Sequence, residues 1–138
     1  MKQWTEIIFI LLFSFAISYL PVSAFEIIDF QSQAIKIELH KSYQGLMKAN
    51  EIQVYEIDVD YKSAFQIALL QKRSDIDFEV VDADGNSLGF CDEHGIGKDE
   101  RCIYELDTGK YYIVLEEMWE EFSPFHLKVE DVHEYAFY

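Results

Sequence analysis

The residues of this sequence best suited to chemistry are oxygen donors gathered in one short segment. They are four aspartates and one asparagine: Asp75, Asp77, Asp82, Asp84 and Asn86. Calcium takes six to eight oxygen ligands, which proteins supply from carboxylates, side-chain amides and backbone carbonyls. The spacing is not that of an EF-hand, because Gly85 precedes Asn86 instead of following it. The segment is a candidate calcium site, and the preferred alternative is a solvated acidic strand ending in a hairpin turn.

A second acidic group lies between the two cysteines of the chain. Its members are Asp92, Glu93, His94, Asp99 and Glu100. A transition metal could bind through His94 and one carboxylate, but such sites usually hold more imidazole or thiolate ligands. We therefore interpret this segment as a solvated loop and assign no metal to it.

Paired carboxylates in a third segment raise the question of catalysis. Glu117 and Glu120 are of the residue type that glycosidases use as acid and base. The segment reads as a loop between strands and shows no recognisable cleft, and no other part of the chain carries a catalytic pattern. We therefore predict that the protein is not an enzyme.

Large apolar side chains in the same loop point to binding. Met118, Trp119 and Phe122 stand among four glutamates. Such residues either cap the end of a core or meet a partner, and aromatic residues with acidic neighbours suit a basic protein or a sugar. We predict these three residues as ligand-binding residues, with capping of the core as the alternative.

The cysteines and the N-terminus both indicate export. Cys91 and Cys102 are the only two cysteines, and in an oxidising compartment they are expected to form one disulfide. Residues 1–24 have the features of a signal peptide: a lysine, an apolar run over residues 7–17, and small residues before Phe25. We predict a signal peptide at 1–24 and a single domain at 25–138, periplasmic or extracellular, with an uncleaved anchor helix as the alternative. The apolar run is shorter than a membrane span of about 20 residues.

The overall charge limits the class of partner. The chain has 138 residues and a formal net charge of −15. Such a surface repels nucleic acid and anionic lipid and attracts cations or basic proteins. We therefore predict a protein or glycan partner outside the cell, no nucleic acid and no membrane span in the mature chain.

The elements that must position these residues are short strands. Apolar and polar residues alternate, with turn signals about every ten residues, in segments 34–39, 52–60, 64–70, 75–80, 87–91, 103–106, 111–115 and 125–129. We interpret 41–51 as a loop, expect a bulge near Val54 and Tyr55, and expect 111–115 to pair with 125–129 at an edge. The Asp84-Gly85 pair predicts a hairpin. About eight short strands with no helical period predict an all-β antiparallel sandwich of jelly-roll type.

A family resemblance rests on the order of these strands and turns. The chain carries YEIDV at 55–59, DIDFEV at 75–80 followed by DGN at 84–86, DTGKYYIV at 107–114, and FHLKV at 125–129. This order resembles the bacterial pre-peptidase C-terminal domain over residues 52–130. The resemblance implies a secreted jelly-roll β-sandwich of the kind appended to extracellular peptidases and similar to the collagen-binding domains of collagenases, some of which bind calcium. The chain departs from the family in lacking a peptidase and in carrying the cysteine pair.

These observations together predict a secreted, non-catalytic binding module for a protein or polysaccharide, with calcium as its one expected cofactor. The alternative is an accessory or inhibitor-like subunit of an exported peptidase.

Overall fold

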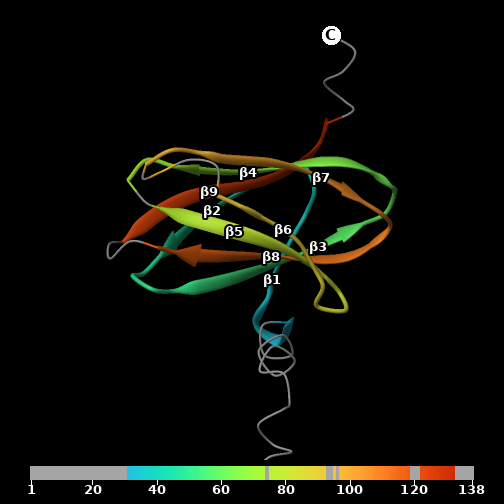
Figure 1. Cartoon of the computed structure of the whole chain (residues 1–138), viewed down its shortest axis with the longest axis horizontal. Helices are drawn as coiled ribbons and strands as arrows, with labels where there is room; N and C mark the ends of the chain where they lie inside the picture. The colour runs from blue at the N-terminus through green and yellow to red at the C-terminus, as the bar shows by residue number, and fades with distance from the viewer. Residues whose placement is uncertain (1–30, 74, 93–94, 96, 119–121, 133–138) are drawn as a thin grey trace, which may run out of the picture.

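The computed structural model describes residues 31–73, 75–92, 95, 97–118 and 122–132 (Figure 1). The signal peptide predicted at 1–24 lies outside these residues. The described part of the chain forms nine strands: β1 (Ile35–Ile37), β2 (Ser42–Met47), β3 (Ile52–Val59), β4 (Ser63–Gln71), β5 (Ile76–Asp82), β6 (Ser87–Cys91), β7 (Glu100–Leu106), β8 (Gly109–Glu117) and β9 (Ser123–Asp131). None of the helical segments in this part is long and apolar enough to cross a membrane.

The strands form two sheets that pack face to face. The five-stranded sheet has the order β1-β3-β8-β5-β6 and the four-stranded sheet the order β2-β9-β4-β7. From β2 to β9 each strand lies in the other sheet from the strand before it, except in the β5–β6 hairpin, and all strand pairs are antiparallel, which is the order of a jelly roll. The short β1 adds to one edge in parallel with β3. The predicted all-β jelly-roll sandwich is therefore confirmed.

The core lies between the inner faces of the two sheets. Each strand buries alternate residues, as the sequence pattern predicts, because successive side chains of a strand point to opposite faces. In β5 the inward residues are Ile76, Phe78 and Val80, each at most 1% exposed. The rings of Tyr55 and Phe125 pack edge to face across the sandwich, with centroids 6.2 Å apart. Inward aromatic and aliphatic residues from both sheets therefore form one core.

The interpretation of 41–51 as a loop is wrong for its first half, which forms β2 and pairs with β9. Gly45, a residue type common in turns, lies opposite Phe125 in that pairing. A Cβ atom at Gly45 would lie 2.3 Å from Cζ of the Phe125 ring. The glycine is there because the ring packs directly against the backbone, so it marks a close approach and not a turn.

Two further strand predictions are also wrong. β8 and β9 do not pair, since β8 lies inside the five-stranded sheet and β9 inside the four-stranded sheet. The expected bulge near Val54 is absent, because β3 pairs with β8 in one unbroken register. Val54 is out of phase with the core because it packs on the outer face of its sheet, and the irregularity of the sheet lies between Val80 and Val81 instead.

The two ends of the sandwich carry different connections. The β2–β3, β4–β5, β6–β7 and β8–β9 connections lie at the left in Figure 1, and we call this the Met118 end. The β5–β6 hairpin and the other connections lie at the opposite end, which we call the Asn86 end. The predicted disulfide is present: Cys91 on β6 and Cys102 on β7 join the neighbouring edge strands of the two sheets.

Candidate functional site

The described residues of the predicted ligand-binding loop face solvent. Met118 is 56% exposed and Phe122 is 68% exposed, so neither side chain caps the core. Trp119 lies outside the described residues. The backbone N–H of Met118 donates to the carbonyl of Asp75 at 2.8 Å, which ties the start of the loop to β5. The Met118 end therefore exposes two large apolar side chains in a loop whose first residue is hydrogen-bonded to the residue before β5.

The five oxygen donors predicted for calcium are not brought together. Asp75 and Asp77 lie at the Met118 end, while Asp82, Asp84 and Asn86 lie at the Asn86 end. About 17 Å of extended strand separates Asp77 from Asp82. The segment therefore supplies two separate groups of oxygen donors.

The group at the Asn86 end is a hairpin turn held by one carboxylate. Asp82 Oδ1 accepts the backbone N–H groups of Asp84 at 3.0 Å and Asn86 at 2.8 Å, and its Oδ2 accepts from Asn86 Nδ2 at 3.1 Å. These hydrogen bonds, those from Asn86 first, hold the pKa of Asp82 below its usual value. The predicted hairpin is confirmed, and its carboxylate already serves the turn.

The group at the Met118 end gains partners that the sequence did not suggest. Asp77, Asp92 and Glu100 each offer a carboxylate oxygen, and these oxygens lie within 4.8 Å of one another. Asp77 and Asp92 are brought side by side because their neighbours Phe78 and Cys91 are partners in the β5–β6 pairing. Glu100 is fully buried at the start of β7, which corrects the prediction of a solvated loop at this residue. Three carboxylates would supply part of the six to eight oxygens of a calcium site.

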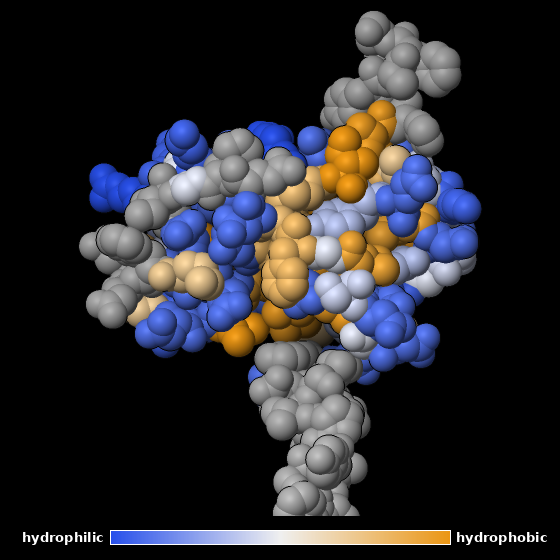
Figure 2. Space-filling model, viewed as in Figure 1, coloured by the Kyte–Doolittle hydropathy of each residue, from blue (hydrophilic) through white to orange (hydrophobic). Residues whose placement is uncertain are grey.

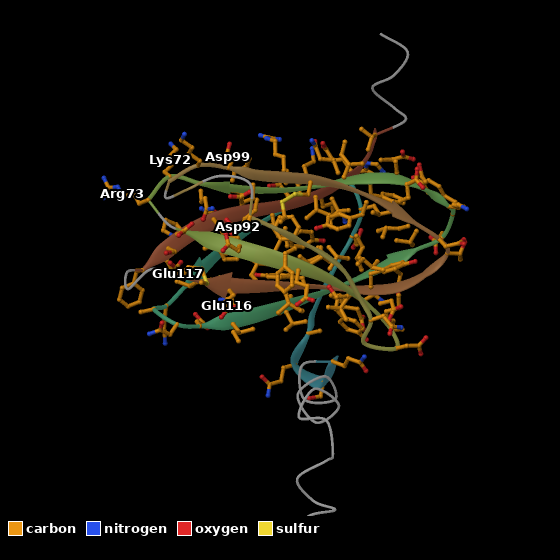
Figure 3. All side chains as sticks on the ribbon, in the orientation of Figure 1. Lys72, Arg73, Asp92, Asp99, Glu116 and Glu117 are labelled. Carbon is orange, nitrogen blue, oxygen red and sulfur yellow. A yellow bond between two sulfur atoms is a disulfide. The ribbon has the colours of Figure 1, made fainter. Side chains whose placement is uncertain are left out.

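The surroundings of Asp77 in this cluster disfavour its negatively charged form. Burial first, and then the negative charges of Asp92, Asp75, Glu100 and Glu116, raise the pKa of Asp77 to about 7. Oδ1 of Asp77 is buried and has no hydrogen-bond partner among the residues that the structure describes. Figure 3 shows Asp92 and Glu116 at the same end of the sandwich as Lys72 and Arg73. His94 and Glu93, weighed with this loop for a metal, lie outside the described residues.

A buried amide holds two connections of the Met118 end together. Gln71, the last residue of β4, is only 4% exposed. Its backbone N–H donates to Asp99 Oδ1 at 3.0 Å, and its Nε2 donates to the carbonyl of Lys98 at 3.0 Å. The β4–β5 and β6–β7 connections are therefore fixed to each other by hydrogen bonds.

Of the two glutamates considered as a catalytic acid and base, only Glu117 lies among the described residues. Glu117 faces the interior at 2% exposed, a poor position for a group that must reach a glycoside. Glu120 lies outside the described residues.

The comparisons with known proteins agree with the geometry at the level of fold. No protein-family model matches the chain, and no curated protein matches it. Among solved structures, the pre-peptidase C-terminal domain of a collagenase from Bacillus anthracis is similar, with a TM-score of 0.62, 17% identity, and coverage of 70% of this chain and 93% of that one. The chain thus has the jelly-roll fold of that domain, which confirms the resemblance seen in the sequence.

Two other solved structures share the fold. One is PliG of Aeromonas hydrophila, a periplasmic lysozyme inhibitor of g-type lysozyme, with a TM-score of 0.51, 16% identity, and coverage of 70% of this chain and 96% of that one. The other is the Yersinia pseudotuberculosis-derived mitogen, with a TM-score of 0.51, 11% identity, and coverage of 64% and 82%. At these identities the similarity shows the fold alone.

Proposed function

We propose that this protein is an exported, non-catalytic binding module whose ligand is another protein. The observation that carries the proposal is the exposure of Met118 and Phe122 on a base anchored to β5. When a partner covers large apolar side chains that a rigid scaffold exposes to water, the buried apolar surface stabilises the complex. The disulfide and the closed core supply the rigidity, which lowers the entropy lost on binding.

The fold neighbours support the same class of function. The chain covers nearly the full length of a domain that belongs to a collagenase and of an inhibitor of g-type lysozyme. The inhibitor is named as a periplasmic protein, which agrees with the signal peptide predicted at residues 1–24. A polysaccharide ligand is the alternative for the same aromatic loop.

The test of this function is a capture experiment with a matched pair of variants. The exported chain is immobilised and exposed to the secreted proteins and to the cell-wall glycans of its source. We expect protein capture that the Met118→Ser/Phe122→Ser double variant reduces at least tenfold, because both apolar contacts are lost. Ile103→Ser serves as a control, since Ile103 is 59% exposed in the middle of β7, away from the Met118 end. Retention of glycans and of no protein would contradict the proposal.

A second candidate is favoured by the length of the match to the lysozyme inhibitor. The chain covers 96% of that protein, so the whole inhibitor corresponds to this one domain. We propose as the alternative an inhibitor-like or accessory subunit of an exported enzyme, a peptidase or a lysozyme. The two functions are distinguished by inhibition assays against a g-type lysozyme and against the exported peptidases of the source. An inhibitor lowers the activity of one of these enzymes, whereas a simple binding module leaves their activity unchanged.

Export itself is tested by the N-terminus of the secreted protein. We expect the mature chain to begin at Phe25, after Ala24, in the periplasm or the medium. N-terminal sequencing of the purified protein measures this directly, and a chain that keeps Met1 would contradict the signal peptide.

A further inference from the structure

The outer face of the five-stranded sheet carries apolar residues where a solvated face is usually polar. Val114 on β8 lies opposite Glu79 on β5, and Glu79 lies opposite Phe90 on β6. Phe90 is 70% exposed although it stands in a regular strand next to the disulfide. Figure 2, in the orientation of Figure 1, shows apolar surface in the middle of the view with hydrophilic residues beside it. The face therefore combines an exposed aromatic ring with acidic neighbours.

A hollow in this face has both apolar and acidic lining. Besides Phe78 it is lined by the apolar residues Phe90 and Val114 and by the acidic residues Asp77, Glu79 and Glu116. Glu79 stands between Phe90 and Val114 on the three neighbouring strands. Asp77 and Glu116 are direct partners in the β5–β8 pairing. Like charges placed directly opposite in a sheet repel each other and destabilise it. The hollow thus holds negative charge that a cation would neutralise.

The carboxylates of the hollow differ from the others on the same face. Asp58 pairs with Lys36 at 2.8 Å, and Glu56 pairs with Lys110 at 3.3 Å. Across the described residues no lysine or arginine forms an ion pair with Asp77, Glu79 or Glu116. Among the described residues, lysines therefore pair with the carboxylates of Glu56 and Asp58 on β3, whereas the carboxylates of the hollow on β5 and β8 have no such partner.

We propose that this hollow binds the side chain of an arginine or lysine presented by a protein partner. The cationic group lies among Asp77, Glu79 and Glu116, and the apolar stem or guanidinium plane lies against Phe90 and Val114. An N–H donor of this group also satisfies the buried Oδ1 of Asp77, which has no partner among the described residues. The proposal rests on the proposed function and adds to it a surface and the chemistry of the partner.

Two properties favour a basic side chain over a free metal ion. The exposed ring of Phe90 offers a cation–π contact and an apolar wall, which an aliphatic stem uses and a hydrated ion does not. The net charge of −15 attracts a basic protein over a distance and increases its association rate. Burial first, and then the neighbouring negative charges, raise the pKa of Asp77, and the positive charge of a bound cation would stabilise its carboxylate against both effects.

The direct test uses a pair of peptides that differ only in charge. A capped pentapeptide with arginine between alanines is titrated into the exported chain and followed by NMR, and its counterpart carries citrulline in place of arginine. We expect shifts of the Phe90 and Val114 signals with the arginine peptide and at least tenfold weaker binding of the citrulline peptide. Equal binding of the two peptides, or shifts confined to other residues, would overturn the proposal.

Variants locate the site and separate it from the broader function. The Glu79→Gln/Glu116→Gln variant should weaken binding of the arginine peptide at least tenfold, whereas Glu105→Gln, an exposed carboxylate of β7, should change it less than twofold. Thermal unfolding of each variant shows that the fold is kept. Calcium that shifts the same signals while the arginine peptide does not would identify a metal ion as the occupant and overturn the proposal.

The capture experiment distinguishes failure of this surface from failure of the proposed function. If Glu79→Gln/Glu116→Gln captures the protein partner as well as the native chain does, the surface is wrong and the binding function stands. If the native chain captures no protein, the function itself fails, whatever the peptides show.

Discussion

The side-chain amide of Gln71 forms with Ile76 the two hydrogen bonds that a neighbouring strand would form. Oε1 of Gln71 accepts the N–H of Ile76 at 2.9 Å, and Nε2 donates to the carbonyl of Ile76 at 3.1 Å. Both groups are buried, so the amide satisfies a donor and an acceptor that water does not reach. One buried side-chain amide therefore holds strand β5 and the β6–β7 connection in place at the Met118 end, near the candidate binding surfaces.

Replacing Gln71 by leucine should destabilise the protein by about 2–3 kcal/mol, because Ile76 would keep its buried N–H and carbonyl without partners. Urea unfolding followed by tryptophan fluorescence or circular dichroism measures the change. Gln66→Leu on the same strand, where the side chain points to the outer face, is the control and should change stability by less than about 0.5 kcal/mol. Equal effects of the two variants would show that the amide is not needed.

Gly45→Ala should destabilise the protein by about 1–3 kcal/mol, because the added Cβ would overlap the buried ring of Phe125. Gly95→Ala is the matched control, since nothing lies within 4 Å of a Cβ at that position. The unfolding midpoint in urea compares the two variants. A Gly45→Ala protein as stable as the native chain would show that the ring can move aside at little cost.

Strand β5 and Gly45 show what the sequence could and could not predict. Alternation placed Ile76, Phe78 and Val80 inside correctly, because the face of a strand residue depends on local periodicity. The role of Gly45 depends on a ring 80 positions away in the sequence, and local propensity alone indicated a loop.

The same limit applies to the candidate site. Asp77, Asp92 and Glu100 meet only because Phe78 of β5 pairs with Cys91 of β6 and the disulfide holds β7 beside β6. Each of these residues was interpreted within its own segment of the sequence, whereas their meeting depends on pairings between distant segments, which periodicity does not encode. The Asp84-Gly85 hairpin and the cysteine pair, which are local signals, were predicted correctly.

The Asp77 carboxyl should make stability depend on pH between about 4 and 7. Its pKa is about 7 in the folded protein and about 3.9 in the unfolded chain. Between these values the folded state binds more protons, so the free energy of unfolding falls as pH rises through this range and the loss is complete above pH 7. Because solvent partly screens this side chain, we expect a loss on the order of 1–2 kcal/mol.

The Asp77→Asn variant tests the assignment of this pH dependence. It removes the ionising group, so the slope between pH 4 and 7 should flatten and the variant should be more stable than the native protein at pH 8. Urea unfolding at pH 5 and pH 8 measures both quantities. Asp60→Asn, an exposed aspartate at the Asn86 end, should keep the native slope, and a native slope in Asp77→Asn would assign the titration to another group.

Calcium stabilisation is still a prediction from the sequence, and the geometry determines which variants test it. The hypothesis predicts that millimolar calcium in place of EDTA raises the unfolding temperature by several degrees, because a ligand of the folded state stabilises it by mass action. At ten times the dissociation constant the gain is about 1.4 kcal/mol. The rise should disappear in Asp92→Asn and persist in Asp84→Asn, because only the first residue belongs to a cluster of carboxylate oxygens within 4.8 Å. The reverse pattern would assign calcium to the hairpin, and no rise in the native protein would refute the hypothesis.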